Sequence, residues 1–464
     1  MNNPIETDYL IVGAGAAGMA FADTILTETD ARILIVDRHH RPGGHWNDAY
    51  PFVRLHQASA CYGVNSRELS HGVKDTVGLN KGLCDLAGGA EVLGYYDQLL
   101  RQRFLPSGRV QYFPMCNVTS DDEFESVLTG QCHRVKVHKK IVDATYSATA
   151  VPSTHPPKYY VEPGVRFAPL NDLPKVAQPR TGYVVVGSGK TGIDACLWLL
   201  EQGVGPERIR WIMPRDAWLL DRAKIQPTDE FFFDIFASLA RQLEAVAAAR
   251  SISDLFDRLE ASGDLLRIDP RVRPTVYRCA TISQAELVQL RRIDGIVRLG
   301  HVRAVEATQI VLEQGQLPLS PDSLVIDCSA SGIPQRPLVP VWAGVRITLQ
   351  MVRVCQPTFS AALIAHIEGT FHDEAEKNGL CAPVPGPYLD IDWLRMLAVS
   401  VKNRFAWAQH PGIEQWLAQS RLDLFASAWR VQPGENEKVA LLQRYRGAVM
   451  PALAKLPQLL ASVA

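Results

Sequence analysis

The sequence predicts an α/β protein with two Rossmann-like dinucleotide-binding domains, a helical insert and a helical C-terminal region. Two observations support this fold class: a GxGxxG motif follows the apolar run 9–12, and a second GxGxxG motif follows the apolar run 183–186. Each motif precedes a helical stretch and a further apolar run, which is the strand, turn, helix, strand order of a βαβ unit. Such units build parallel sheets that bind ligands where the strands end.

The first glycine motif has the spacing that a pyrophosphate requires. Glycine lets the backbone turn sharply and brings its amides close to an anion at a helix N-terminus. An acidic residue follows the next apolar run, 19 residues after the last glycine, where a carboxylate can accept the ribose hydroxyls. This context favours a dinucleotide site over a glycine turn without a ligand. The expected contacts are Gly13, Gly15, Ala16, Ala17, Gly18, Asp37 and Arg38.

The second glycine motif could also be a P-loop, because Gly189-Lys190-Thr191 matches the end of that template. The P-loop needs a glycine where Val184 stands, whereas GxGxxG is complete, so we favour a second dinucleotide. Arg215 follows the next apolar run in place of an acid. An arginine there suits a 2′-phosphate and predicts NADPH rather than NADH, although a solvated surface arginine is the alternative. The expected contacts are Gly187, Ser188, Gly189, Lys190, Thr191, Gly192 and Arg215.

Two dinucleotide sites, with the first near the N-terminus, predict FAD in the first and NADPH in the second. We expect an FAD-binding domain at 1–170 that resumes at 325–385, and an NADPH-binding domain at 175–324. Apolar residues at helical spacing predict an insert at about 229–266 within the NADPH-binding domain. Helix-forming residues predict a helical C-terminal region at 386–464.

Composition argues against several other classes. The 464 residues are 47% hydrophobic, and 48 Lys plus Arg nearly balance 49 Asp plus Glu. This balance indicates a globular protein and gives no reason to expect nucleic acid or an anionic membrane as partner. No leader-like stretch precedes Tyr9 and no apolar run reaches the length of a membrane span, so we expect a cytoplasmic protein.

The cysteines and histidines follow no metal or disulfide pattern. Nine cysteines occur without a CxxC pair, and twelve histidines occur without HExxH. We therefore expect reduced thiols and no metal site. Reductases of the thioredoxin type pass flavin electrons to a close cysteine pair, and that acceptor is missing from the sequence.

The segment Gly43-Gly44-His45-Trp46 resembles the GGxW signature of the class B flavin monooxygenases, which include flavin-containing, N-hydroxylating and Baeyer–Villiger enzymes. The resemblance covers both glycine motifs and implies that Gly44, His45 and Trp46 contact FAD. It further implies that the stretch 54–57 approaches the isoalloxazine and that Val110 lies by the adenine. Asp327, which opens the segment 327–332, is similar to the strand end that closes the FAD domain.

One departure from the family concerns the FxGxxxH fingerprint, which the stretch beginning at Phe167 does not reproduce. This departure argues against Baeyer–Villiger activity. The chain is also similar to a set of bacterial and fungal FAD/NAD(P)-binding oxidoreductases through Leu55-His56-Gln57, Tyr62–Ser66 and Gly189–Gly192. That similarity implies a fold and no substrate.

The resemblance implies that NADPH reduces FAD, that O₂ forms a flavin C4a-(hydro)peroxide, and that oxygen passes to a small organic substrate. His56 and Gln57 are the candidate catalytic residues, because a neutral imidazole and an amide can donate hydrogen bonds without fixed charge. The pocket is expected between the two nucleotide domains. Two alternatives stay open: an NAD(P)H-dependent flavin reductase or dehydrogenase without oxygen transfer, and a non-catalytic flavin-fold binding protein.

Overall fold

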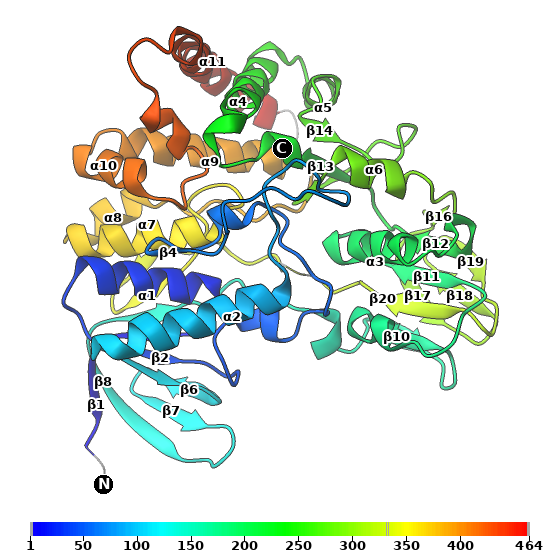
Figure 1. Cartoon of the computed structure of the whole chain (residues 1–464), viewed down its shortest axis with the longest axis horizontal. Coiled ribbons are helices and arrows are strands. Elements are labelled where there is room, and N and C mark those ends of the chain that lie inside the picture. The colour runs from blue at the N-terminus through cyan, green and yellow to red at the C-terminus, as the bar shows by residue number, and fades with distance from the viewer. Residues whose placement is uncertain (1–2, 331, 333, 462–464) are drawn as a thin grey trace.

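The computed structural model describes residues 3–330, 332 and 334–461, whose two largest sheets are mainly parallel and have helices packed over them (Figure 1). In the first sheet the parallel strands β8 (Cys132–Asp143), β1 (Ile5–Val12), β2 (Ile33–Val36) and β5 (Val110–Phe113) are neighbours in that order. All four residues of β2 are buried, as expected for a parallel strand covered on both faces. The predicted fold class is confirmed.

Helices and short strands complete the first domain. Helix α1 (Ala16–Glu28) packs against α7 (Pro357–Thr370), and their buried side chains share one core with α2 (Gly89–Leu99). The antiparallel strands β6 (Cys116–Ser120) and β7 (Glu123–Ser126) extend the sheet from β8. The chain re-enters this sheet late, through β22 (Arg346–Thr348) beside β8 and β21 (Trp342–Ala343) beside β22.

The second sheet is also parallel, in the order β10 (Phe167–Pro169), β20 (Leu324–Asp327), β11 (Tyr183–Val186), β12 (Ile209–Ile212) and β16 (Ile296–Val297). Helices α3 (Lys190–Glu201) and α6 (Gln284–Leu290) pack together on it. A smaller sheet packs against its buried side chains and contains β9 (Tyr160–Val161), β17 (Val302–Val305), β18 (Gln309–Leu312) and β19 (Gly315–Pro318).

The strand β20 corrects the expected domain boundary. We expected the FAD-binding domain to resume at residue 325, but Val325, Ile326 and Asp327 pair with β10 and β11 of the second sheet. The first sheet resumes only at Trp342. The expectation is wrong because Asp143 and Asp327 each end a strand, and the two strands occupy equivalent places in two similar sheets. Asp327 was therefore assigned to the wrong sheet. Ser331, part of the expected segment 327–332, lies outside the described residues.

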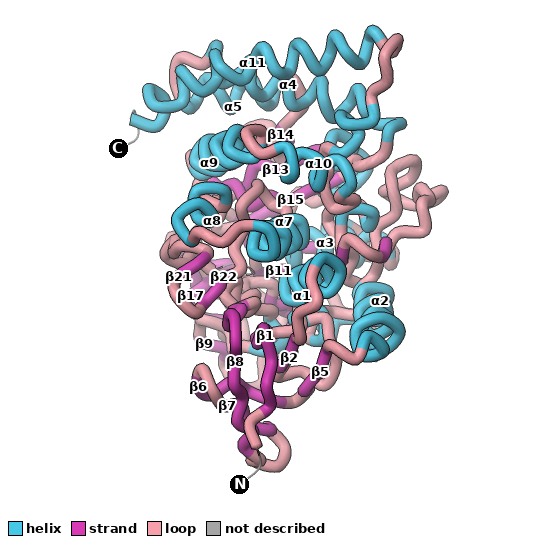
Figure 2. Tube along the Cα trace, turned by 90° about the vertical axis from the view of Figure 1, so that its left-hand side faces the viewer, coloured by secondary structure: helices cyan, strands magenta, loops and turns pink. Residues whose placement is uncertain are grey.

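Helices form a layer at the end of the molecule opposite the N-terminus (Figure 2). Helix α4 (Phe232–Ala248) packs along α11 (Asn436–Ala461), and α5 (Ile252–Ala261) lies beside α4. The remaining C-terminal helices α9 (Asp392–Trp407) and α10 (Pro411–Gln419) lie between this layer and α7. A three-stranded sheet of β14 (Leu265–Leu266), β13 (Ala217–Asp221) and β15 (Val276–Ile282) connects the layer to the second domain.

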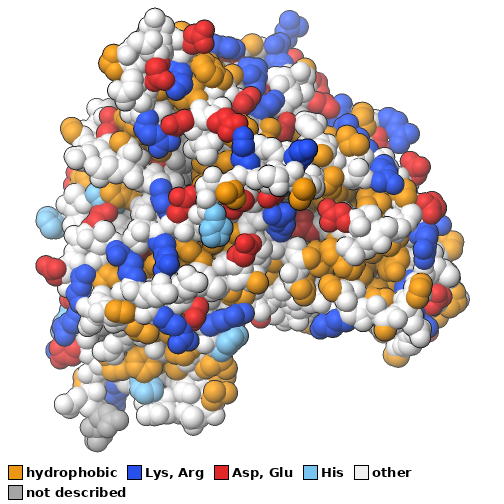
Figure 3. All heavy atoms as spheres, in the orientation of Figure 1, with side chains coloured by type: hydrophobic (Ala, Val, Ile, Leu, Met, Phe, Trp, Pro, Cys, Tyr) orange, Lys and Arg blue, Asp and Glu red, His pale blue; other side chains and the backbone are white. Residues whose placement is uncertain are grey.

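Basic and acidic side chains are interspersed over the face shown in Figure 3. In the part of the chain that the structure describes, no helix is long and apolar enough to cross a membrane. The same residues contain no group of three or more His, Cys, Asp or Glu side chains that could hold a metal ion.

One pair of cysteines differs from the expectation of reduced thiols. Cys279 in β15 and Cys355 before α7 form a disulfide, with Cα atoms 6.4 Å apart. The two residues are 76 positions apart in sequence, so no local spacing could reveal the pair. The other seven cysteines are free.

Candidate functional site

The first glycine motif forms a tight turn between β1 and α1. Gly13 has φ of +103°, and a Cβ on Gly18 would lie 2.0 Å from the Gly13 carbonyl oxygen. Gly44, with φ of +56°, approaches the turn so closely that its Cβ would lie 2.9 Å from the Cα of Gly15. The backbone of the turn is therefore bare where α1 begins, as a pyrophosphate needs. The expected contacts Ala16 and Ala17 are the first residues of α1.

Asp37 lies at the end of β2 and supports this turn directly. Its Oδ2 accepts the amide of Ala14 at 2.5 Å, and its Oδ1 accepts the backbone amide of His39 at 2.7 Å. The imidazole of His39 links Asp37 to Asp48, at 2.9 Å and 3.0 Å. Hydrogen bonding to Asp37 raises the pKa of His39 above its ordinary value. Arg38 is exposed beside this network.

The second motif repeats the same construction between β11 and α3. Gly187 has φ of +126°, and a Cβ on Gly192 would lie 2.1 Å from the Gly187 carbonyl oxygen. The indole of Trp211 donates to that same oxygen at 2.7 Å, which fixes the turn. Gly189 has open space around it and precedes Lys190 at the start of α3. Ser188 in the turn is partly buried, and so is Thr191, the second residue of α3.

Arg215, after β12, does not stand alone in solvent. Its Nη2 donates to the hydroxyl of Tyr388 at 3.0 Å, and its guanidinium lies 4.8 Å from the centre of that ring. Arg278 lies over the same ring at 4.5 Å. The hydrogen bond from Arg215 lowers the pKa of Tyr388 below its ordinary value. Two guanidinium groups therefore converge on one phenol at the end of β12, where a 2′-phosphate is expected.

His45 and Trp46 lie beside the first turn. Their rings are stacked with centres 5.3 Å apart, and the indole of Trp46 donates to the hydroxyl of Tyr62 at 2.7 Å. Burial lowers the pKa of His45 to about 4, so its imidazole is neutral near neutral pH. Trp46 is 8% exposed and belongs to the core under α2.

His56 carries a buried polar atom without a partner. Its Nδ1 makes no hydrogen bond to any described residue. Burial lowers its pKa well below the ordinary value, and the positive charges of Lys190 and Arg222 add to this effect. Gln57 next to it donates from Nε2 to the carbonyl oxygen of Cys355 at 3.5 Å. The charge of Lys190, in the second glycine motif, therefore acts on His56 of the first domain.

The segment that carries these residues docks on α3. The hydroxyl of Tyr50 donates to Asp194 at 2.5 Å, and Asp194 also pairs with the Lys190 ammonium. The ring of Phe52 stacks on Trp198 at 4.9 Å. The two domains are therefore joined by a polar contact at Asp194, in the N-terminal half of α3, and an aromatic contact at Trp198, in its C-terminal half.

Arg222 is a site residue that the sequence did not indicate. Its side chain is 2% exposed and pairs with Glu286 at 2.8 Å. It donates to the carbonyl oxygens of His56 and Thr281, both at 3.1 Å, and to Asn80 Oδ1 at 3.3 Å. A single arginine in a short turn belongs to no sequence motif. Only the three-dimensional structure shows that Arg222 links residues from several distant segments.

One expected FAD contact, Val110, lies away from the first glycine turn. Val110 begins β5 opposite Ile33, at the end of the sheet away from the glycine turn, whereas ligands bind at the carboxyl ends of parallel strands. The segment that reaches the Asp37 end is Met115-Cys116, where the amide of Cys116 donates to the Asp37 carbonyl oxygen at 3.0 Å. The expectation for Val110 is therefore wrong.

Asp327 belongs to the second site. Its Oδ1 accepts the amide and the hydroxyl of Ser329, at 3.0 Å and 2.6 Å. The equivalent residue of the first sheet is Asp143, whose Oδ1 accepts the amide and hydroxyl of Thr145 at 2.8 Å and 2.7 Å. Thr145 packs against Gly13, where an added Cβ would lie 3.0 Å from its methyl group. Asp143 and Thr145 are thus the strand end beside the first glycine turn, and Asp327 is the counterpart of Asp143 in the second sheet.

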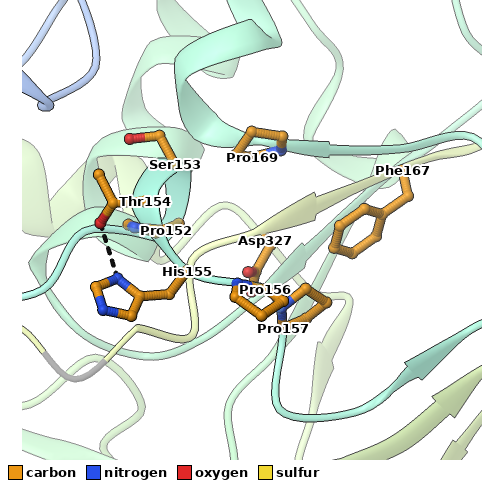
Figure 4. A pocket seen from close by; sticks show the side chains of 9 residues that line it. All are labelled: Pro152, Ser153, Thr154, His155, Pro156, Pro157, Phe167, Pro169 and Asp327. Atoms are coloured by element: carbon orange, nitrogen blue, oxygen red, sulfur yellow. Dashed lines mark hydrogen bonds between the residues drawn. The ribbon is translucent and has the colours of Figure 1, made fainter. Parts of the chain in front are cut away.

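A cavity of about 350 Å³ lies at the carboxyl end of β20 (Figure 4). It is lined by the segment 152–157, which connects the two sheets, and by Phe167, Pro169 and Asp327. Four prolines and Phe167 give the cavity an apolar part, and Ser153, Thr154, His155 and Asp327 give it a polar part. The substrate pocket was expected between the two nucleotide domains, and this cavity lies at Asp327, next to the strand that leads into the second glycine turn.

Comparison with known sequences identifies relatives of the whole chain. The model of the NAD(P)-binding Rossmann-like domain matches residues 11–64, which include the first glycine motif and His45-Trp46. The uncharacterized protein Rv2000 of Mycobacterium tuberculosis is 51% identical over 456 residues, which cover 97% of this chain and 84% of that protein. The uncharacterized protein Mb2023 of Mycobacterium bovis matches equally. This chain belongs to their family. The family match extends through the second glycine motif and most of the helical layer.

Several solved monooxygenase structures are similar to this chain in part. The open crystal structure of cyclohexanone monooxygenase gives a TM-score of 0.48 at 13% identity, over 78% of this chain and 88% of that chain. Oxidized steroid monooxygenase bound to NADP gives a TM-score of 0.47 at 12% identity, over 96% of this chain and 98% of that chain. Polycyclic ketone monooxygenase from the fungus Thermothelomyces thermophila gives 0.49 at 13% identity, over 97% and 89%.

Proposed function

We propose that this chain is an FAD-dependent, NADPH-using monooxygenase that acts on a small organic substrate with O₂. The observation that carries the proposal is the pair of glycine turns at 13–18 and 187–192. Each opens a helix at the carboxyl end of a parallel strand, and each is too tight for a side chain at its last glycine. Glycines at this spacing leave the backbone amides of the turn bare at the start of the helix, as a pyrophosphate needs.

The residues present fit the two cofactors. In the first turn, Asp37 uses three of its roughly four acceptor positions on Ala14 and His39, which leaves one for a ribose hydroxyl. In the second domain, Arg215 and Arg278 supply charge for a 2′-phosphate, which favours NADPH. When bound, FAD supplies the hydride and oxygen chemistry of the reaction.

The chain's own part is to hold polar groups near the reacting region and exclude water. His56 and Gln57 are our candidate residues there, because the neutral His56 imidazole has a free Nδ1 and Gln57 has an amide. Tyr50 and Phe52 fix this segment against α3. Donors held in a water-poor site stabilise developing charge more strongly than donors in solvent.

The test is a rapid-mixing experiment on the purified protein. The protein is reduced with NADPH without oxygen and then mixed with oxygenated buffer, while the flavin absorbance is followed. We expect a transient blue-shifted absorbance before the oxidised spectrum returns, and faster decay of the transient when an amine or thioether substrate is present. Direct return to oxidised flavin, with or without such substrates, would favour a reductase. Absence of bound flavin would favour a binding protein.

A further inference from the structure

The Cys279–Cys355 disulfide joins the three-stranded sheet of β14, β13 and β15 to the segment that leads into α7. Both cysteines are partly buried, so a small reductant can approach them. Both have left-handed backbones, with φ of 54° and 52°, which residues with side chains rarely adopt. The pairing of β15 with β13 shifts register between Tyr277 and Thr281, which places Cys279 in a bulge. Bulges and strained backbones concentrate at functional sites.

The Cys355 half of the disulfide touches the expected flavin-facing segment. The side-chain amide of Gln57 donates to the carbonyl oxygen of Cys355 at 3.5 Å. The next residue, Gln356, is 6% exposed, and its Oε1 has no partner among the described residues. A shift of the backbone at Cys355 therefore changes the acceptor that positions Gln57.

The Cys279 half reaches the same segment through three hydrogen bonds. The hydroxyl of Thr281 donates to the carbonyl oxygen of Cys279 at 3.3 Å. The Thr281 carbonyl oxygen accepts from Arg222, which also donates to the carbonyl oxygen of His56, each bond being 3.1 Å. Both sulfur-bearing residues are thus hydrogen-bonded, directly or through Arg222, to neighbouring residues of one short segment.

We propose that Cys279–Cys355 is a reversible redox site, opened by a dithiol reductant, whose state sets the position of His56 and Gln57. A thiolate of the reductant attacks one sulfur, the Cys279–Cys355 bond breaks, and the released sulfur takes a proton. The second thiol of the reductant then displaces the remaining cysteine, so two electrons pass to the pair and the reductant becomes a disulfide. The redox state changes where the side chains of His56 and Gln57 lie. That these two residues face the flavin rests on the proposed function.

The first test counts thiols in the native wild-type protein and needs no variant. The protein is equilibrated in mixtures of oxidised and reduced dithiothreitol, quenched in acid, unfolded and alkylated, and each cysteine is identified by mass spectrometry. We expect free thiols to rise from seven to nine, with Cys279 and Cys355 appearing together at one reversible midpoint. The exposed Cys132 serves as the internal control, because its labelling stays constant. A bond that opens only after unfolding, or two cysteines already free without reductant, would overturn the proposal.

The second test measures the coupling to the site. Hydrogen exchange at the amides of residues 56–58 is compared between the oxidised and reduced wild-type protein, and with Cys279→Ser as a variant that cannot close the bond. We expect faster exchange in the reduced protein and in the variant, and unchanged exchange in β2. Equal exchange at 56–58 in both redox states would refute the coupling. A protein that holds no FAD and does not react with NADPH would instead refute the proposed function, with the thiol titration unaffected.

Discussion

Replacing Asp37 by asparagine tests the first glycine turn. The carboxylate of Asp37 is 5% exposed and accepts from the Ala14 amide, the His39 amide and the His39 imidazole. In Asp37→Asn one oxygen becomes an NH₂ group, so either Ala14 or His39 faces a donor in place of an acceptor. A hydrogen bond to a charged group contributes about 1.5–3 kcal/mol, and a buried donor left unpaired costs about 1–3 kcal/mol. If the same loss falls on the ribose contact, about 2 kcal/mol corresponds to about a 30-fold rise in the FAD Kd.

The assay is equilibrium titration of the FAD-depleted protein with FAD, together with urea unfolding. Asp8→Asn is the matched control, because Asp8 also accepts a backbone amide, from Arg32 at 2.8 Å, but lies on an exposed part of the same domain. We expect the control to leave the FAD Kd unchanged. An Asp37→Asn protein with wild-type FAD affinity would refute the role assigned to this carboxylate.

Three further predictions concern the second turn, the NADPH phosphate and pH. Gly192→Ala should abolish flavin reduction by NADPH, because its Cβ would lie 2.1 Å from the Gly187 carbonyl oxygen. Gly447→Ala in α11, where an added Cβ meets nothing within 4 Å, is the control and should keep the reduction rate. Arg215→Ala should raise the KM for NADPH about tenfold or more, because a charge-assisted hydrogen bond to the 2′-phosphate is lost, and should leave the KM for NADH nearly unchanged. An equal rise in the KM for both cofactors would contradict the phosphate site. The lowered pKa of His45, about 4, means that the unfolded chain binds an extra proton between about pH 4 and 6.5, so stability falls on acidification through that range. His45→Gln should flatten this part of the thermal-unfolding profile against pH, and an unchanged profile would refute burial as the cause.

The glycine turns were predictable because their requirement is local. A sharp turn that must open a helix needs glycine at fixed spacing, and Gly13, Gly18, Gly187 and Gly192 satisfy it within one strand–helix unit. The acid after the second strand follows the same local logic, and Asp37 does lie at the turn. Local sequence therefore predicted both βαβ units and the residues that shape them.

What the sequence could not supply was the order of strands that are distant in the chain. Asp143 and Asp327 end similar strands and make the same contacts with a hydroxyl residue two positions later, so only pairing shows which sheet each one closes. The misplacement of Val110 has a similar cause, because register decides which end of β5 meets the ligand. Arg222 and the Cys279–Cys355 pair depend on contacts between distant segments, which no spacing rule reports.

An anaerobic titration of the purified protein with NADPH and, separately, with NADH tests the two cofactor sites most directly. We expect that the protein carries FAD, that stoichiometric NADPH bleaches the flavin absorbance, and that NADH does so only at much higher concentration. If the protein binds no FAD, or if NADPH does not reduce the bound flavin, the assignment of one glycine turn to FAD and the other to NADPH is contradicted.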